Sequence, residues 1–580
     1  MLSSCCFSRR NISIVRNLFL AQSLLLMLVS IATAQVDSTD KRLPETRQLE
    51  FPLDVKDSSA TTLRAAMPKI DLPEYEITGN AVIDLPGAEK LSAPEDTQSS
   101  RIGSLLGTSL NEDRETAQIS IGNKESSHDG VASLFNGRAT ASIGTFFSPK
   151  AGLWFGHNLG DLFYLIDGEY YRTKGFAPYT DRSGGSLDLI ASTTMNSYNP
   201  WFDRSNIHVE LTYKSDTYNW YGTRTPSLGR NRTDFTLSGD LVNWVSSPML
   251  YEGEFGYENF EVDDSSRAVV ETNIRLGGAA GFPVYTVPLT VRLAALVGSI
   301  SRQNSTSGLS FVDLSIGSQR YAWKSISMEG SIHAYLASGM VHQKLARLYP
   351  HLYVAYQLND QNNLSASYAP KVEPLTLSSR IFANRYLSAE SDIKHTDDQQ
   401  DANLALETDW SAATRTRFEA RVQSISDFPL YADSLSRKSW LIAYGGRTTI
   451  ASFSGEIFAK LTANDYFALK LTASISKNSK TGTEVPYLPG FEIGARYVKR
   501  FLSSWTGIAT LTLLHQGVDN VIHANTLPSI FLIGLRGEYQ LFHQAALFLD
   551  VENLLNQQYQ YWSGYQETPF VLSAGISLRW

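Results

Sequence analysis

Strict alternation between apolar and polar side chains is the feature that most constrains the fold of this chain, and it is clearest in the last residues, PFVLSAGISLRW. Successive side chains of a β-strand point to opposite faces, so this segment predicts one strand with an apolar face and a polar face. The apolar face needs either a protein core or lipid to cover it. The apolar set is Phe570, Leu572, Ala574, Ile576, Leu578 and Trp580, and the intervening set is Val571, Ser573, Gly575, Ser577 and Arg579.

The same alternation recurs from about residue 131 to the end of the chain. It is plain in residues 206–216, 249–258, 466–477 and 530–541, and turn sequences such as NLGD, NDQNN and KNSKTG separate many of the runs. Helical periodicity is nearly absent from this region. At roughly 20 residues for each strand with its connection, we expect about 20 to 22 strands. The pattern therefore predicts an all-β fold.

Two properties of these runs favour a membrane barrel over a soluble sheet protein. The polar faces carry many charges, which a water-filled lumen tolerates, and aromatic residues gather at the ends of runs, as in residues 170–171 and 559–562, where they suit the membrane interfaces. A periplasmic β-propeller, the soluble alternative, would show a blade repeat of about 40 to 50 residues, and we find none in the sequence. We therefore predict a transmembrane antiparallel β-barrel.

The first residues have the features of a secretory signal peptide. A basic segment, residues 9–16, precedes an uncharged apolar run that ends in Ala32-Thr33-Ala34. We expect cleavage before Gln35 and not retention as an anchor helix, because polar residues interrupt the apolar run. Both cysteines, Cys5 and Cys6, lie within this leader, so we expect no disulfide and no thiolate metal site in the mature chain.

The region between the leader and the barrel has a different composition. Residues 35–130 are polar, contain prolines and have weak periodicity, so we expect a flexible periplasmic arm or a remnant of a second domain. Within it, PEYEITGN (residues 73–80) would suit a strand added to the sheet of a periplasmic partner, although a plain linker strand is the favoured interpretation. The predicted organisation is a signal peptide (1–34), this arm (35–130) and the barrel (131–580).

The C-terminal region carries a motif that resembles one family of barrels. Residues 553–559 read NLLNQQY and precede a short aromatic-rich loop and the last strand, while residues 349–377 read as a strand, a tight turn and a strand that leads into a long loop with proline. Both features resemble TonB-dependent receptors of the bacterial outer membrane. The terminal Trp580 also resembles the signal that the barrel-assembly machinery of Gram-negative bacteria recognises.

The resemblance implies a function and its partners. It implies a location in the cell outer membrane, surrounded by outer-membrane lipid, and a role in binding or transporting a solute, with a TonB-like periplasmic protein as the partner of the N-terminal arm. The alternative is a barrel that transports nothing and anchors or assembles with periplasmic or surface proteins. Residues 35–130 are too few for the complete plug domain of these receptors, so we expect a reduced, vestigial or absent plug.

A barrel of this width without a plug would leak. We expect residues 80–130, a long loop folded inward or another chain to fill the lumen. The loop candidates are residues 175–205 and 374–401. We therefore predict a barrel that is occluded and not permanently open.

Motifs for enzyme chemistry are missing from the sequence. The histidines lack metal-ligand spacing, and no nucleophile elbow or glycine-rich phosphate loop is present. We therefore predict no enzyme and no catalytic, cofactor-binding or metal-binding residues. His395 with Asp397, Asp398 and Asp401 would suit a divalent cation, but a solvated acidic loop is the favoured interpretation.

The carboxylates Glu252, Glu254 and Glu258 fall on the predicted polar face of one strand. They would favour cations in the lumen, although a hydrophilic barrel wall explains them without hydrolase chemistry. The chain has 50 Lys and Arg against 58 Asp and Glu. This acidic balance is a poor match for the phosphates of nucleic acid, so we predict no nucleic-acid partner.

Overall fold

The computed structural model describes residues 137–195, 199, 201–243, 250–264, 267–284, 287–433, 438–462, 464–502, 504–521 and 525–580. These residues form one 23-stranded sheet, one two-stranded sheet and a short helix. The predicted signal peptide, the arm with its segment 73–80 and the candidate filling segment 80–130 lie outside the described residues. No helix of the described residues is long and apolar enough to cross a membrane.

The strands of the large sheet follow one another along the chain. They are β1 (Gly137–Gly144), β2 (Ser148–Leu159), β3 (Leu162–Thr173), β4 (Arg182–Met195), β5 (Ser205–Asn219), β6 (Gly229–Asn243), β7 (Leu250–Asp263), β8 (Ala268–Val284), β9 (Val287–Arg302), β10 (Ser305–Trp323), β11 (Ile326–Ser338), β12 (Lys344–Gln357), β13 (Asn362–Tyr368), β14 (Lys371–Glu373), β15 (Thr396–Ser411), β16 (Thr414–Ser426), β19 (Arg447–Thr462), β20 (Asp465–Asn478), β21 (Phe491–Leu502), β22 (Trp505–His515), β23 (Ile530–Phe542), β24 (Ala545–Glu552) and β25 (Val571–Arg579). The helix is α3 (Leu377–Ala383), and the small sheet pairs β17 (Leu430–Ala432) with β18 (Leu441–Ala443).

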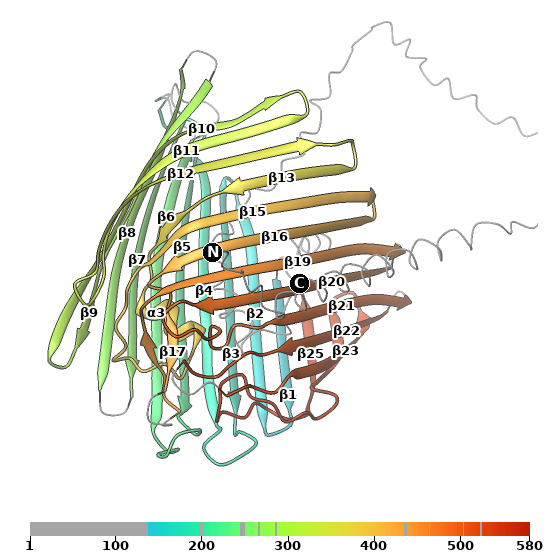
Figure 1. Cartoon of the computed structure of the whole chain (residues 1–580). Coiled ribbons are helices and arrows are strands. Elements are labelled where there is room, and N and C mark those ends of the chain that lie inside the picture. The colour runs from blue at the N-terminus through green and yellow to red at the C-terminus, as the bar shows by residue number, and fades with distance from the viewer. Residues whose placement is uncertain are drawn as a thin grey trace, which may run out of the picture. The chain divides into compact units, whose positions relative to one another are not determined.

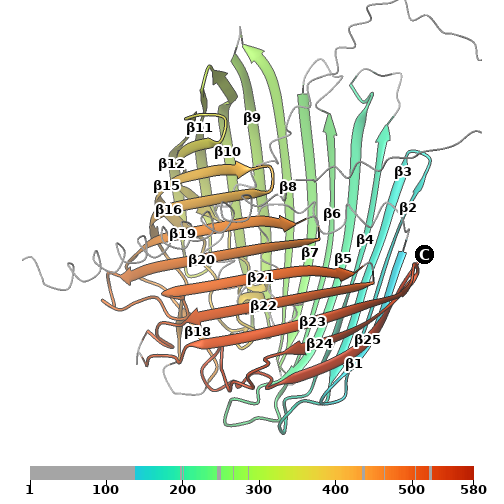
Figure 2. The same ribbon diagram turned by 90° about the vertical axis from the view of Figure 1, so that its right-hand side faces the viewer.

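The large sheet closes on itself as an antiparallel barrel (Figures 1 and 2). Neighbours in the chain pair with each other, and the last strand, β25, pairs with β1 from Arg138↔Arg579 to Gly144↔Ser573. β13 and β14 both pair with β15 and are two halves of one strand, interrupted at residues 369–370. Counted as one, they give a barrel of 22 strands. The prediction of an all-β barrel of about 20 to 22 strands is therefore confirmed.

The two faces of the barrel wall differ as the alternation predicts. Apolar side chains such as Leu348, Val297 and Leu336 are 69%, 62% and 59% exposed, which suits a surface covered by lipid. Charged side chains occupy the other face and pair across neighbouring strands. The Arg421–Asp401 and Lys470–Glu456 pairs have N–O distances of 2.5 and 2.7 Å.

The C-terminal strand β25 follows the same rule. Ile576 and Leu578 are exposed on the outer face, whereas Ser577 is fully buried on the inner face. Arg579, also on the inner face, forms an ion pair with Glu538 of β23 at 2.9 Å. The two faces predicted from the last residues of the sequence are therefore confirmed.

The two mouths of the barrel are bordered by connections of different length. Short turns join the strands at one mouth, as at residues 160–161, 324–325 and 543–544. The other mouth carries longer loops, which are residues 374–395, 427–446, 479–490, 516–529 and 553–570. In outer-membrane barrels the short turns face the periplasm and the long loops face outward, so we assign the long-loop side as the outer mouth.

Both loop candidates need correction. Residues 182–195, expected within a loop from 175 to 205, form β4. The outward positions of β4 are apolar only over residues 187–191, and this run is too short for the alternation to stand out. Residues 396–401, expected within a loop from 374 to 401, begin the barrel strand β15.

Candidate functional site

A loop at the outer mouth, residues 374–395, folds inward and packs on the inner wall of the barrel, where Figure 1 places its helix α3. The helix begins at its N-cap Thr376, where the side chains of Thr376 and Ser379 each accept a hydrogen bond from the other residue's amide. A helix of seven residues is too short to be stable alone. Contacts with the barrel wall must therefore hold it.

Two carboxylates of the wall bind the start of α3. Glu271 of β8 accepts hydrogen bonds from the amides of Leu377 and Ser378 at 2.9 and 2.7 Å. Glu258 of β7 accepts one from the Ser378 hydroxyl at 2.5 Å. The first amides of a helix have no partner within the helix, and negative charge is favourable there. Glu271 is fully buried, so this contact is shielded from water.

Two arginines of β6 hold the end of α3 and the segment that follows it. Arg230 donates to the carbonyl oxygens of Arg385 and Leu387, both at 2.8 Å, and forms an ion pair with Asp264. The Arg232 guanidinium lies 4.3 Å from the centre of the Phe382 ring. Arg230 is fully buried, and its two hydrogen bonds to these carbonyl oxygens fix the loop to the wall.

A histidine fixes the other end of the loop. The His395 amide donates to Gln343, and the Gln343 side chain donates back to the His395 carbonyl. The Nδ1 atom of His395 accepts from the Leu375 amide at 3.2 Å, so Nε2 carries the proton and donates to the Ser338 carbonyl. Burial lowers the pKa of His395, which favours this neutral form.

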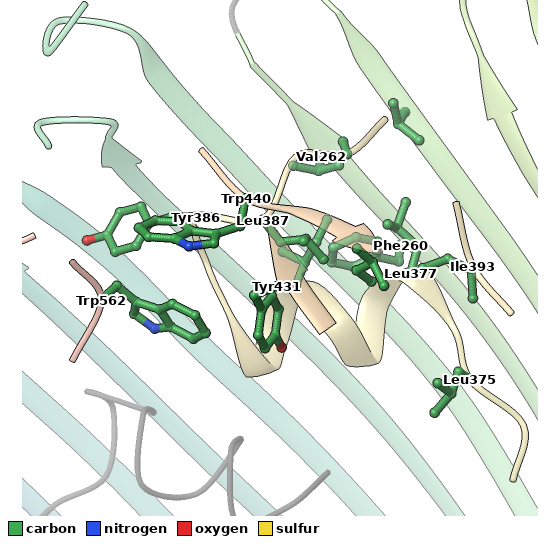
Figure 3. Close-up of a cluster of buried hydrophobic side chains, with 14 of the residues drawn as sticks. Phe260, Val262, Leu375, Leu377, Tyr386, Leu387, Ile393, Tyr431, Trp440 and Trp562 are labelled. Carbon is green, nitrogen blue, oxygen red and sulfur yellow. The ribbon is translucent and has the colours of Figure 1, made fainter. Parts of the chain in front are cut away.

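Aromatic rings from three loops meet beside the inward loop (Figure 3). Tyr386 stacks on Tyr565 with ring centroids 3.4 Å apart, while Trp562 packs against Trp440 and Tyr431 at 5.4 and 5.0 Å. All five side chains are buried. These buried rings, in contact with one another, join the three loops.

We call residues 374–395, 430–433, 438–444 and 561–566 the cap. The cap contacts the wall at β6–β8 and reaches β11 and the β11–β12 connection through His395. Its residues 561–566 belong to the β24–β25 loop, where Tyr565 stacks on Tyr386. These places lie well apart in the ring of strands, because ring order follows chain order. The cap therefore crosses the lumen. The inward folding expected of a loop within residues 374–401 is present in residues 374–395.

The predicted group of His395, Asp397, Asp398 and Asp401 is not one site. Asp397 binds Arg347 and Tyr349 at 2.9 and 2.6 Å, Asp401 binds Arg421, and Asp398 accepts from Gln423. Among the described residues there is no group of three His, Cys, Asp or Glu side chains that suits a metal ion. The favoured reading, a solvated acidic loop, is wrong, because all four residues are buried at the start of β15.

Glu252, Glu254 and Glu258 alternate on the inner face of β7. Glu258 is partnered by Arg275 and by the cap, whereas Glu254 stands directly opposite Asp240 of β6. Like charges in direct opposition repel each other, so this part of the wall favours water or cations beside it. The sequence pattern placed these carboxylates on the polar face, but it held no sign that Glu258 binds the cap.

No family model matches the chain, and no curated protein matches it. Solved structures do. The FrpB iron transporter from Neisseria meningitidis (F3-3 variant) is 11% identical, with a TM-score of 0.61 over 78% of this chain and 83% of that one. The copper transporter OprC is 13% identical, with a TM-score of 0.57 over 77% and 80%. The siderophore receptor PiuA from Acinetobacter baumannii is 8% identical, with a TM-score of 0.59 over 77% and 81%. The chain therefore shares their fold.

Proposed function

We propose that this chain, whose barrel has the fold of TonB-dependent receptors, binds a solute at the outer surface and moves it across the outer membrane of a Gram-negative bacterium. The cap supports the proposal most directly. A wide lumen with charged walls is suited to the passage of a polar solute, and the cap crosses this lumen at the outer mouth, where a solute would enter.

The cap takes over part of the closure that a complete plug provides. Glu271 and Arg230 anchor the cap through short hydrogen bonds to backbone groups of the loop, and these bonds are not covalent. A conformational change that breaks them opens the outer mouth without unfolding the barrel. A TonB-like periplasmic protein acting on the arm, residues 35–80, is the proposed source of the driving force.

Single-channel conductance in planar bilayers tests this function. Wild-type protein is expected to be closed most of the time, and the double variant Arg230→Met/Glu271→Gln is expected to open in bursts, because it loses the wall contacts of the cap. The matched control Arg417→Met/Glu254→Gln makes the same substitutions on the wall away from these contacts and is expected to behave as wild type.

Two results would contradict the proposal. A large, permanently open pore in the wild type would show that the cap does not close the mouth. Absence of conductance in the double variant, even after removal of residues 35–136, would argue against a passage and in favour of the alternative, a barrel that anchors partner proteins.

A further inference from the structure

The cap contains hydrogen-bond donors that are buried without an acceptor. Arg380 of α3 is only 6% exposed, and its Nε is buried without an acceptor. Among the described residues, the hydrogen bonds of Arg380 are those of its backbone. The Tyr431 hydroxyl and the side-chain amide nitrogen of Asn384 are buried and unpaired in the same way. All three groups are hydrogen-bond donors, and none of the three has a carbonyl or carboxylate acceptor among the described residues.

These donors lie close together. Arg380 and Asn384 are one turn apart, with the Asn384 amide bonded to the Arg380 carbonyl at the end of α3. Figure 3 places Tyr431 beside α3, and Arg380 is near enough to act electrostatically on the Tyr431 hydroxyl. Burial raises the pKa of Tyr431, so the hydroxyl keeps its proton at neutral pH and remains a donor.

An unpaired buried guanidinium is costly, and the two wall arginines that pack against the same loop avoid this cost. Burying a cation without a partner is strongly unfavourable, and native structures leave few buried polar groups unsatisfied. Arg230 and Arg232, packed against the same loop, both have carboxylate partners, Asp264 and Asp216. The contrast with Arg380 points to a ligand that supplies the missing acceptors.

We propose that Arg380, Tyr431 and Asn384 form a binding site for an oxyanion, a carboxylate or a phosphate group. The fork of the guanidinium matches two oxygens of such a group, and the hydroxyl and amide supply two further donors. This inference rests on the proposed function for one point only, that the oxyanion belongs to the transported solute. The transported solute is then anionic.

The enclosure of the site couples binding to the cap. Because Arg380 is buried by the closed cap, an anion reaches it when the cap opens and then stabilises the closed form by supplying its acceptors. Bound anion should therefore slow amide exchange in residues 374–395. It should also change the emission of Trp440 and Trp562, which lie in the same cluster.

The test uses the full-length barrel purified in detergent, titrated with malonate or with inorganic phosphate at constant ionic strength. A saturable change in tryptophan emission together with slower exchange in residues 374–395 is expected for at least one of the two anions. Malonate alone identifies a carboxylate site, and phosphate alone identifies a phosphate site. No saturable response to either anion overturns the proposal.

Three variants separate a binding role from a structural one. Arg380→Met is expected to weaken the response at least tenfold while the anion-free cap exchanges no faster than in wild type, because only an unpaired charge is lost. Tyr431→Phe removes a single hydroxyl and is expected to weaken binding by a smaller factor. Arg417→Met, a wall arginine away from the cap, is expected to bind as wild type.

Faster exchange of the anion-free cap in Arg380→Met would identify Arg380 as a structural anchor and overturn the site. Failure of this inference is distinguishable from failure of the transport proposal. Anion binding in a barrel that never conducts would support the anion site and contradict the transport proposal. Conductance without anion binding would support the transport proposal and contradict the anion site.

Discussion

The contact between Glu271 and the start of α3 yields the sharpest quantitative expectation. Each oxygen of the carboxylate accepts one backbone amide, from Leu377 at 2.9 Å and from Ser378 at 2.7 Å. Glu271→Gln keeps the shape of the side chain but replaces one acceptor with an amino group, which then faces an amide donor. One charge-assisted hydrogen bond is lost, and one buried amide is left without an acceptor.

The expected cost follows from these two changes. A hydrogen bond to a charged group contributes about 1.5–3 kcal/mol, and an unpaired buried donor costs about 1–3 kcal/mol. Since the loop will relax in part, we expect a loss of about 2–4 kcal/mol in the free energy that keeps the cap closed. At about 1.4 kcal/mol for each factor of ten, the open population rises roughly 30- to 700-fold.

Hydrogen exchange followed by mass spectrometry measures this change, because exchange of a protected amide tracks the population of the open form. Peptides that cover residues 374–383 should exchange faster by that factor, and peptides from the barrel strands should not change. Glu254→Gln is the matched control, since the Glu254 side chain lies exposed on the inner face of β7 and no side-chain hydrogen bond joins it to another described residue. Equal protection of the cap in wild type and Glu271→Gln would refute the role given to this carboxylate.

Three further expectations follow from the same contacts. Arg230→Met removes the donor to the Leu387 carbonyl, one of two donors to the Arg385 carbonyl, which keeps its bond from the Tyr218 hydroxyl, and the ion pair with Asp264. We therefore expect residues 384–388 to lose about 3–5 kcal/mol of protection, more than in Glu271→Gln, and a smaller loss would contradict the assignment of Arg230 as the main anchor. Burial in the closed cap lowers the pKa of His395, so the released loop binds a proton more readily than the closed cap. The stability of the closed cap should therefore be constant above the ordinary His pKa of about 6.5 and fall as the pH drops below it. Tryptophan emission should report this change, and His395→Gln should remove it. Deleting residues 35–80 should abolish cellular accumulation of a labelled solute while the barrel still inserts, as judged by protease accessibility of its outer loops; unchanged uptake would count against energised transport.

The architecture of the wall was predictable because lipid and water impose it residue by residue. Ile576 and Ser577 fall on opposite faces of β25, as a period of two requires, and no distant contact decides their placement. The strand count followed from the same local rule. β4 escaped detection because the outward positions of Ser183 and Gly185 interrupt its apolar face.

The cap was not predictable in the same way, because its contacts join residues far apart in the chain. Glu271 binds Leu377 and Ser378 across more than a hundred positions, and Asp397 finds its partner Arg347 on β12. In the sequence such carboxylates look like any other charge on a polar face. The one local signal was the sequence TLSS at residues 376–379, whose hydroxyls form the N-terminal cap of α3.

The seam between β1 and β25 sets the order in which the molecule can be completed. β1 obtains its second neighbour only when β25 is in place. The ladder between them is short, covering only Arg138–Gly144, whereas β9 pairs with β10 from Leu289 to Arg302. Until β25 pairs with β1, the sheet is an open ribbon whose interior is accessible from the side. The loop of residues 374–395 must therefore lie inside the lumen before β1 and β25 pair, or else enter the lumen afterwards through the outer mouth.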